Sequence, residues 1–228
     1  MNISGIVKSS LIDYPGLICC VLFVPGCNYT CFYCHNRALV DGSHLLLSPR
    51  YVMDFLKKRA GLLDGVVISG GEPTLQSGLL PFLTILRELD YQIKLDTNGS
   101  NPNIIKELIR QGLCNYFAVD YKAPSSRYTS VCGMDSNAEK VLETLDILLD
   151  SDSTFEVRTT VLPELGAEEL MAMAKELPVV PRYVLNRYRV PSTFLPEDEL
   201  RVRRKAHTAE DLQFFAACVS AYQPNVVF

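Results

Sequence analysis

An excess of positive charge is missing from this 228-residue sequence, in which 22 Lys and Arg residues stand against 26 Asp and Glu residues and the formal net charge is −4. Proteins that bind nucleic acid through its phosphates carry clustered positive charge. No uninterrupted apolar stretch approaches the roughly 20 residues that span a bilayer, and residues 1–10 hold one Lys and no apolar signal-like segment. We therefore expect a soluble, cytosolic protein with neither nucleic acid nor membrane as a partner.

Cysteine is present in an unusual pattern, with eight residues in the chain. In the reducing compartment expected for a protein without an export signal, cysteines are core residues or metal ligands rather than disulfides. Only Cys27, Cys31 and Cys34 form a tight group. Most of the others are expected to pack as small hydrophobic residues; they are Cys19, Cys20, Cys114, Cys132 and Cys218.

Short β-rich runs alternate with helix-period segments, a pattern typical of βα units around a parallel sheet. Hydrophobic residues make up 48% of the chain, enough for one sizeable core, and one domain over residues 1–228 is expected. Ser48 before Pro49 and Asn101 before Pro102 indicate helix starts, and a last helix is expected over about 208–222. Six strands are predicted: Ile18–Val24, Val66–Ser69, Gln92–Leu95, Tyr116–Val119, Phe155–Val161 and Arg182–Leu185.

Six strands with intervening helices predict an α/β fold, an incomplete (β/α)6 TIM-like barrel with its core over residues 18–190. In such barrels the chemistry gathers at the carboxyl ends of the strands. Polar sequences, two of them with glycine, lie at or near that end of the expected strands. The segments expected on one rim are 27–34, 70–73, 96–99, 120–122 and Arg158.

The cysteine loop, residues 25–36, places three thiols with three and then two residues between them, and no fourth cysteine is near in the sequence. Iron–sulfur clusters are usually held by four thiolates, so three would leave one iron open to another ligand. The alternative is a structural zinc site completed by His35 or a distant cysteine. Structural zinc sites usually use paired Cys-x2-Cys units, and this loop has one such spacing.

The spacing Cys27-x3-Cys31-x2-Cys34, with Tyr33 before the last cysteine, resembles the cluster loop of the radical S-adenosylmethionine (SAM) superfamily. The resemblance implies one four-iron, four-sulfur cluster on the three cysteines, with the amine and carboxylate of SAM on the fourth iron. It also implies that Tyr33 packs near the adenine, although simple loop packing explains Tyr33 equally.

A second match is the segment Ser69-Gly70-Gly71-Glu72-Pro73, which directly follows a predicted strand. Glycines let the backbone approach a ligand closely, and a carboxylate complements an ammonium group. Alone it would be only a strand-to-helix turn. The segment resembles the Gly-Gly-Glu-Pro motif of the same family, which implies that it receives the SAM amino group.

Three further groups follow later strands, and the resemblance to glycyl-radical enzyme activases gives them roles. It implies that the group at 96–98 lies beside the SAM ribose and carboxylate, as does the group at 120–122 after the next strand. It also implies that Arg158 pairs with the SAM carboxylate. Singly, Asn98-Gly99 would be an ordinary turn, and a surface salt bridge explains either basic residue. The groups are Asp96, Thr97 and Asn98, then Asp120 and Lys122, then Arg158.

The amino-terminal part carries a narrower set of residues: Asp13-Tyr14-Pro15-Gly16, Pro25-Gly26-Cys27 and Cys34-His35-Asn36. These are similar to the activating protein of anaerobic ribonucleoside-triphosphate reductase. The resemblance implies reductive cleavage of SAM to a 5′-deoxyadenosyl radical, which generates a glycyl radical on a partner enzyme. It also implies an electron donor of the flavodoxin or ferredoxin type. A partner's peptide loop needs an open groove beside the cluster, which we expect residues 13–16 to border.

Two other functions stay open. One is a radical SAM enzyme that acts on a small molecule, such as a ring-rearranging nucleotide-precursor enzyme. The other is an iron–sulfur or zinc module with no SAM chemistry. His35 is unassigned, and the basic run Arg201–Lys205 either docks an acidic partner or is a solvated face.

Overall fold

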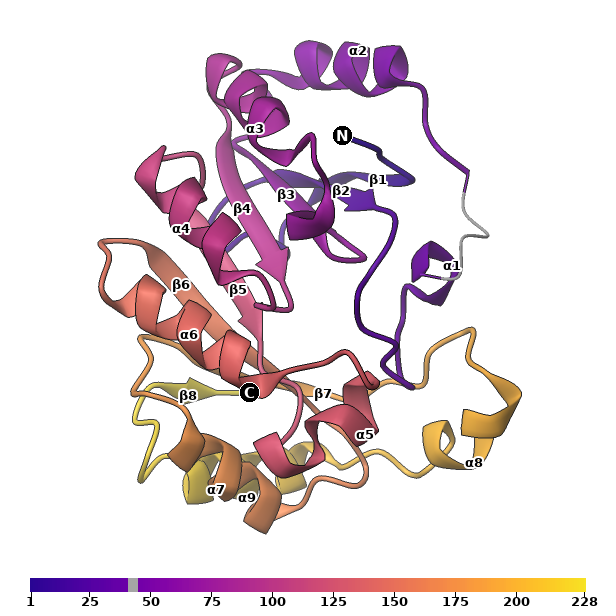
Figure 1. Cartoon of the computed structure of the whole chain (residues 1–228), viewed down its shortest axis with the longest axis vertical. Coiled ribbons are helices and arrows are strands. Elements are labelled where there is room, and N and C mark those ends of the chain that lie inside the picture. Colours follow the sequence, from indigo (N-terminus) through magenta and orange to yellow (C-terminus); the bar gives the residue numbers. More distant parts are fainter. Residues whose placement is uncertain (41–44) are drawn as a thin grey trace. The chain divides into compact units, whose positions relative to one another are not determined.

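The computed structural model describes residues 1–40 and 45–228, and the chain forms two compact units. Unit 1 contains residues 1–28, 38–97 and 103–118, and unit 2 contains residues 29–37, 98–102 and 119–228. Strands alternate with helices along the chain (Figure 1). The expectation of one domain over residues 1–228 stays a prediction.

Unit 1 is built on four strands. β2 (Cys19–Val24), β3 (Gly65–Gly70) and β4 (Gln92–Thr97) are parallel and adjacent in that order, and β1 (Gly5–Ser10) pairs antiparallel with β2. The apolar residues of β2 and β3 are almost entirely buried. Near-continuous apolar sequence is typical of parallel strands that are covered on both faces.

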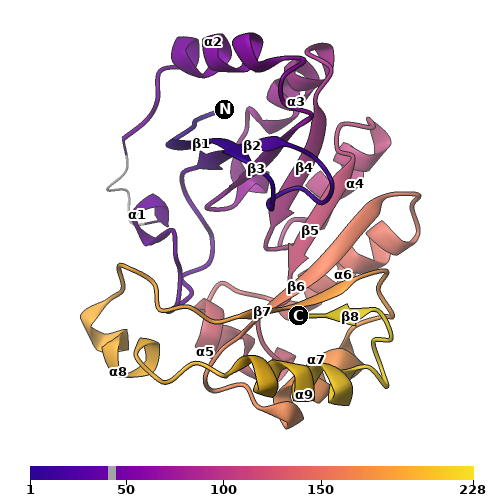
Figure 2. The same cartoon turned by 180° about the vertical axis from the view of Figure 1, so that it is seen from behind.

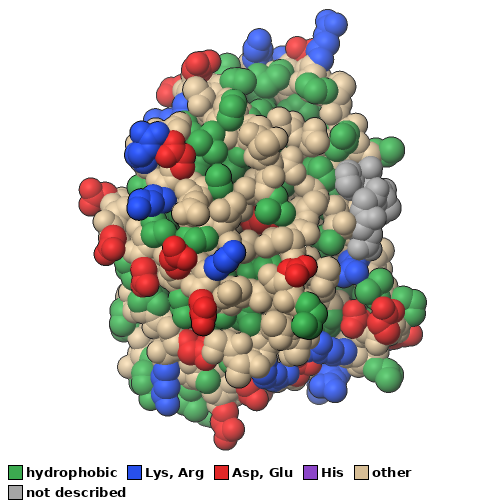
Figure 3. Space-filling model, in the orientation of Figure 1, with side chains coloured by type: hydrophobic (Ala, Val, Ile, Leu, Met, Phe, Trp, Pro, Cys, Tyr) green, Lys and Arg blue, Asp and Glu red, His purple; other side chains and the backbone are tan. Residues whose placement is uncertain are grey.

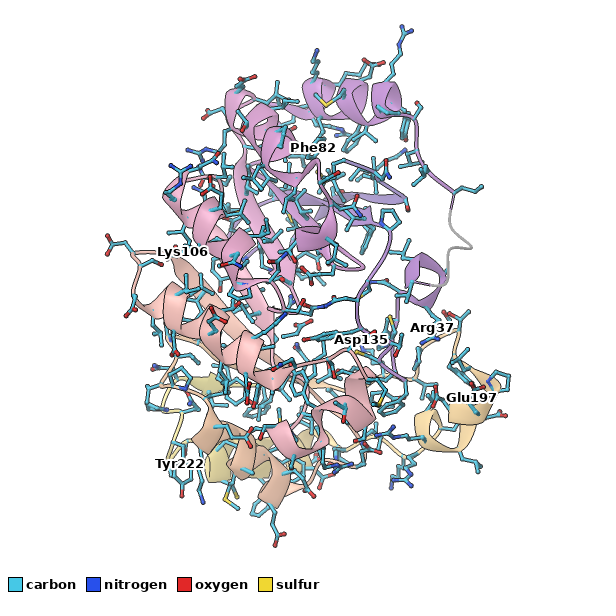
Figure 4. All side chains as sticks on the ribbon, in the orientation of Figure 1. Arg37, Phe82, Lys106, Asp135, Glu197 and Tyr222 are labelled. Carbon is cyan, nitrogen blue, oxygen red and sulfur yellow. The ribbon has the colours of Figure 1, made fainter. Side chains whose placement is uncertain are left out.

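The helices over 49–59 and 102–110 begin where the sequence indicates. The Ser48 hydroxyl accepts the Tyr51 N–H at 3.2 Å and Pro49 is the first helical residue, so this predicted start is confirmed. Phe82 is buried, whereas Lys106 is exposed (Figure 4). The helices are α2 (Pro49–Arg59), α3 (Leu79–Glu88) and α4 (Pro102–Arg110), with the short α1 (Arg37–Val40) after the cysteine loop.

Unit 2 contains a parallel group of strands, β6 (Thr154–Val161), β7 (Tyr183–Arg187) and β8 (Val226–Val227). β5 (Tyr116–Asp120) begins in unit 1 and ends in unit 2. α7 and α9 lie side by side (Figure 2). The helices are α5 (Tyr128–Cys132), α6 (Ala138–Leu149), α7 (Ala167–Glu176), α8 (Glu199–Val202) and α9 (Ala209–Val219).

All six predicted strands are present as β2 to β7, but two strands were missed. β1 has the sequence GIVKSS and is largely exposed. It was missed because it pairs with β2 as an antiparallel strand and is not part of a βα unit. Its polar end gives no strand signal. β8 has only two residues, too few for any periodicity.

The segment Asp13–Gly16 does not border the start of the cysteine loop in unit 1, and for that part of the loop the expectation is wrong. Tyr14 is buried against Cys19, the first residue of β2, and its ring lies 5.8 Å from that of Tyr116, the first residue of β5. The cysteine loop begins after the other end of β2, about 17 Å away at 3.3 Å per residue. Tyr14 is therefore part of the core at the amino ends of the strands, while Pro15 and Gly16 are exposed.

Candidate active site

The start of the cysteine loop and the Gly-Gly-Glu segment are bound together in unit 1. The N–H of Gly71 donates to Val24 O, and the N–H of Glu72 donates to Gly26 O, both at 2.8 Å. A Cβ atom on Gly71 would overlap the Gly26 carbonyl. The second glycine is therefore required by close contact of two backbones, before any ligand is considered.

Replacing Gly71 with Ala is expected to destabilise the metal-free protein by about 2 kcal/mol, because one backbone must move to accept the methyl group. Thermal unfolding followed by circular dichroism measures the effect. Gly5→Ala is the matched control, since its Cβ would meet the Phe23 side chain at an ordinary 3.6 Å. Equal melting temperatures for the two variants would contradict the close contact.

Glu72 is fully buried, and its position is fixed by hydroxyl and backbone donors. Its Oε1 accepts the Thr74 N–H at 3.0 Å, the Thr74 hydroxyl at 2.6 Å and the Thr97 hydroxyl at 2.8 Å. Thr97 thus supports the Glu72 carboxylate. No local pattern indicates this role for Thr97, because the two residues are 25 positions apart.

Asp96 lies at the end of β4, where its Oδ1 is 2.9 Å from Lys94 Nζ. Lys94 is 3% exposed and also donates to Asp13 O at 2.8 Å. A buried ammonium needs such partners, because an uncompensated charge in the core is costly. Lys94 therefore links the Asp96 carboxylate to the backbone of Asp13.

Unit 2 holds the remainder of the cysteine loop against α5. The N–H of Thr30 donates to Cys132 O at 2.8 Å, and the side chains of Cys31 and Cys132 are hydrogen bonded. The hydrogen bond from Cys132 lowers the pKa of the Cys31 thiol to about 7, although burial acts in the opposite direction. A lowered pKa favours the thiolate, which is the form that binds metal.

Asp120 lies between two basic side chains in unit 2. Its Oδ1 accepts from Arg158 Nε at 3.0 Å, and its Oδ2 accepts from Lys122 Nζ at 2.9 Å. Burial raises the pKa of Asp120, but Arg158 and Lys122 together lower it to about 2. The structure thus joins these three predicted residues into one ionised cluster.

Asn98 is buried in unit 2, where its Oδ1 accepts the Ser100 N–H at 2.9 Å. The next carbonyl, of Gly99, accepts the Thr144 hydroxyl at 2.8 Å. These contacts are those of an Asn-Gly turn.

The three loop cysteines are divided between the units, with Cys27 in unit 1 and Cys31 and Cys34 in unit 2. Within residues 1–40 and 45–228, no three His, Cys, Asp or Glu side chains are grouped as a metal site. The assignment of the three cysteines as ligands therefore stays a prediction. Three of the five other cysteines are buried as expected, namely Cys19, Cys20 and Cys132.

A family model described as the radical SAM superfamily matches residues 21–177, which include the cysteine loop, the Gly-Gly-Glu segment and β2 to β6. The chain belongs to the radical SAM superfamily. As a radical SAM enzyme it uses a four-iron, four-sulfur cluster and SAM. The residues present fit these cofactors, since the loop offers three thiols and a buried carboxylate follows β3.

Comparison with a similar protein is more specific than the superfamily match. It is 35% identical over 175 residues to a protein of Methanocaldococcus jannaschii that is provisionally named a glycyl-radical enzyme activating enzyme. The match covers 73% of this chain and 71% of that protein. The conclusion from sequence that this is a radical SAM chain that resembles glycyl-radical enzyme activases is confirmed.

Solved structures show the same fold. A domain of pyruvate-formate lyase-activating enzyme from Bacteroides vulgatus has a TM-score of 0.56 at 19% identity, over 72% of this chain and 97% of that one. Streptococcus suis SuiB, solved with SAM bound, has a TM-score of 0.62 at 15% identity, over 89% of this chain and 48% of that one. The predicted α/β fold of the radical SAM type is confirmed. No helix in the described part of this radical SAM chain is long and apolar enough to cross a membrane.

Sequence reasoning missed residues at the carboxyl end of β7. A cavity of about 460 Å³ lies there, lined by Asn186, Arg187, Tyr188 and Arg189. The His35 side chain is hydrogen bonded to the backbone of Arg189, so the cavity adjoins the end of the cysteine loop. The only signal was position, because Asn186 and Arg187 end a strand of a radical SAM fold, where function gathers.

Proposed function

We propose that this radical SAM enzyme generates a glycyl radical on a partner enzyme, with anaerobic ribonucleoside-triphosphate reductase as the proposed partner. The observation that carries the proposal is the 35% identity, over 73% of the chain, to the provisionally named activating enzyme. The amino-terminal segments similar to the reductase activator support the choice of partner. A cytosolic location and an electron donor of the flavodoxin or ferredoxin type complete the proposal.

The proposed cofactor ligands are those of the sequence motifs. Cys27, Cys31 and Cys34 bind the cluster, and Glu72 receives the SAM ammonium group. When bound, the reduced cluster supplies one electron to SAM, whose sulfur–C5′ bond breaks to give methionine and a 5′-deoxyadenosyl radical. The remaining proposed SAM contacts are Tyr33, Gly70, Gly71, Pro73, Asp96, Thr97, Asn98, Asp120, Lys122 and Arg158.

The hydrogen bonds within these groups support different roles for Glu72 and for the cluster of Asp120, Lys122 and Arg158. Glu72 is fixed by Thr74 and Thr97, so its carboxylate is oriented before SAM arrives. Arg158 and Lys122 share Asp120, which orders both cations. A guanidinium and an ammonium group held in place in this way are suited to a ligand carboxylate.

The cavity after β7 supports a polypeptide substrate. Arginine side chains only donate hydrogen bonds, and Asn186 both donates and accepts. A peptide presents carbonyl acceptors at every residue, so it matches such a lining. The Tyr188 hydroxyl donates to Val202 O at 2.7 Å and is already occupied, which makes Tyr188 part of the floor.

Adding a cognate glycyl-radical protein to the reduced, reconstituted enzyme and SAM is expected to give the doublet electron paramagnetic resonance signal of a glycyl radical. SAM cleavage without the partner should be slow, because nothing then places a C–H bond beside C5′. Rapid turnover of SAM with a small molecule and no partner protein would contradict the proposal and favour a small-molecule enzyme.

A further inference from the structure

The basic run Arg201–Lys205 begins with an arginine that is not directed to solvent. Arg201 Nε donates to Glu164 Oε2 at 2.8 Å, and Arg201 Nη2 donates to Glu164 Oε1. Nη1 of the same side chain donates to Ser130 O at 2.8 Å. The Glu164 side chain is 8% exposed, so this two-pronged pair is well shielded from water.

The same guanidinium stacks on the cysteine loop. Its central carbon lies 3.7 Å from the ring centre of Phe32, the residue directly after Cys31. Phe32 is 5% exposed, and its ring meets that of Tyr33 edge-on, with centres 5.3 Å apart and an interplanar angle of 68°. A continuous contact therefore runs from Glu164 through Arg201 and Phe32 to Tyr33.

Glu164 is itself held from a second side. Arg127 donates to Glu164 Oε1 at 2.9 Å and to the Glu164 backbone carbonyl at 3.2 Å. Glu164 follows β6, whereas Arg127 precedes α5, the helix that hydrogen bonds to the cysteine loop. The Glu164 carboxylate is thus held by two arginines, and it orients the Arg201 guanidinium on the Phe32 ring.

The next basic residues of the run are more exposed. Arg203, directly after α8, pairs with Glu199, and both side chains are more than half exposed. Arg204 Nη1 lies 3.9 Å from Glu164 Oε2, but the Arg204 side chain is 59% exposed. Acidic and basic side chains crowd together over α8 in the space-filling view (Figure 3), and Glu197 marks the turn before α8 (Figure 4). Arg201 combines a buried carboxylate partner, Glu164, with an aromatic ring of the loop, Phe32.

We propose that Arg201 is a positioning residue, which holds the Cys31–Cys34 segment and the Tyr33 ring in place through Phe32. This rests on the proposed function only in taking that segment as the cofactor loop. A lysine cannot substitute, because stacking on a ring while forming a two-pronged pair requires the planar guanidinium. In this proposal Arg201 supports the cysteine loop and does not serve to dock an acidic partner.

The first test measures amide hydrogen exchange in the full-length, metal-free chain. Arg201→Met is expected to speed exchange of the loop peptide that contains Phe32 and Cys34 by about tenfold, because a shielded cation–π contact is lost. Arg203→Met, the same change two residues further along the chain, should leave that peptide unchanged. Unchanged loop exchange in Arg201→Met would overturn the inference, whatever the activity of the enzyme.

The second test separates positioning from general stability. Arg201→Lys and Phe32→Leu are expected to weaken SAM binding to the reconstituted enzyme by about tenfold each, and the double variant by no more than either alone. Additive losses would overturn the inference, because the two side chains would then act independently. Should Arg201→Met fail to fold, these two variants still decide the matter.

If the loop exchanges faster in Arg201→Met and SAM binding weakens, yet no glycyl radical forms with any partner, the proposed function fails while the positioning role stands. If the radical forms normally but loop exchange is unaffected, the positioning role fails alone. The two conclusions are therefore tested by different readouts.

Discussion

Cys31→Ala is expected to abolish cluster assembly, leaving almost no iron and no labile sulfide after anaerobic reconstitution. In the proposed site each of the three loop thiolates binds one iron of the cluster. The variant leaves two thiolates, which cannot hold three irons. Cys27→Ala and Cys34→Ala should behave in the same way. Iron and sulfide analysis with the visible absorption spectrum measures the loss.

Cys132 supplies the sharpest control for this experiment, since its thiol is hydrogen bonded to Cys31 but is not proposed as a ligand. Cys132→Ala should keep iron content near wild type, as should Cys114→Ala and Cys218→Ala. Full iron loading in Cys31→Ala would overturn the ligand assignment. Loss of iron in Cys132→Ala alone would make Cys132 the ligand instead.

Glu72→Gln is expected to weaken SAM binding tenfold to a hundredfold while the cluster is retained. A charge-assisted hydrogen bond contributes about 1.5–3 kcal/mol, which corresponds to that range. Glutamine is a suitable replacement because its carbonyl oxygen can still accept from Thr74 and Thr97, the donors that hold Glu72 Oε1. The negative charge is therefore the main thing removed.

Equilibrium binding of SAM to the reconstituted protein measures the effect. Glu88→Gln is the matched control, since Glu88 is exposed at the end of α3 and should leave affinity unchanged. Unchanged affinity in Glu72→Gln would return Gly70–Pro73 to the role of a strand-to-helix turn.

Local patterns predicted the parts of the molecule that local physics decides. Apolar runs such as Val66–Ser69 predicted strands, and Ser48 with Pro49 predicted a helix start. Strand formation and helix capping were predictable because each depends on residues that are close in the sequence. The carboxyl-end rule then selected Glu72, Asp96 and Asp120, each of which ends or follows a strand.

Contacts between distant residues were beyond that reasoning. Thr97 supports Glu72 from 25 residues away, and Arg201 reaches Phe32 from the far end of the chain. The burial of Tyr14 at the amino ends of the strands was also missed, because Asp-Tyr-Pro-Gly has the composition of an exposed turn. Such positions depend on packing, which one sequence does not reveal.

The most direct test of the proposed function follows a single hydrogen atom. The cognate partner is prepared with deuterium on the Cα of its glycines and mixed anaerobically with reduced enzyme and unlabelled SAM, and the 5′-deoxyadenosine is analysed by mass spectrometry. One deuterium is expected in the 5′-deoxyadenosine, appearing together with the glycyl radical doublet. Unlabelled 5′-deoxyadenosine alongside a full radical signal, or SAM cleavage that the partner does not affect, would contradict the proposed function.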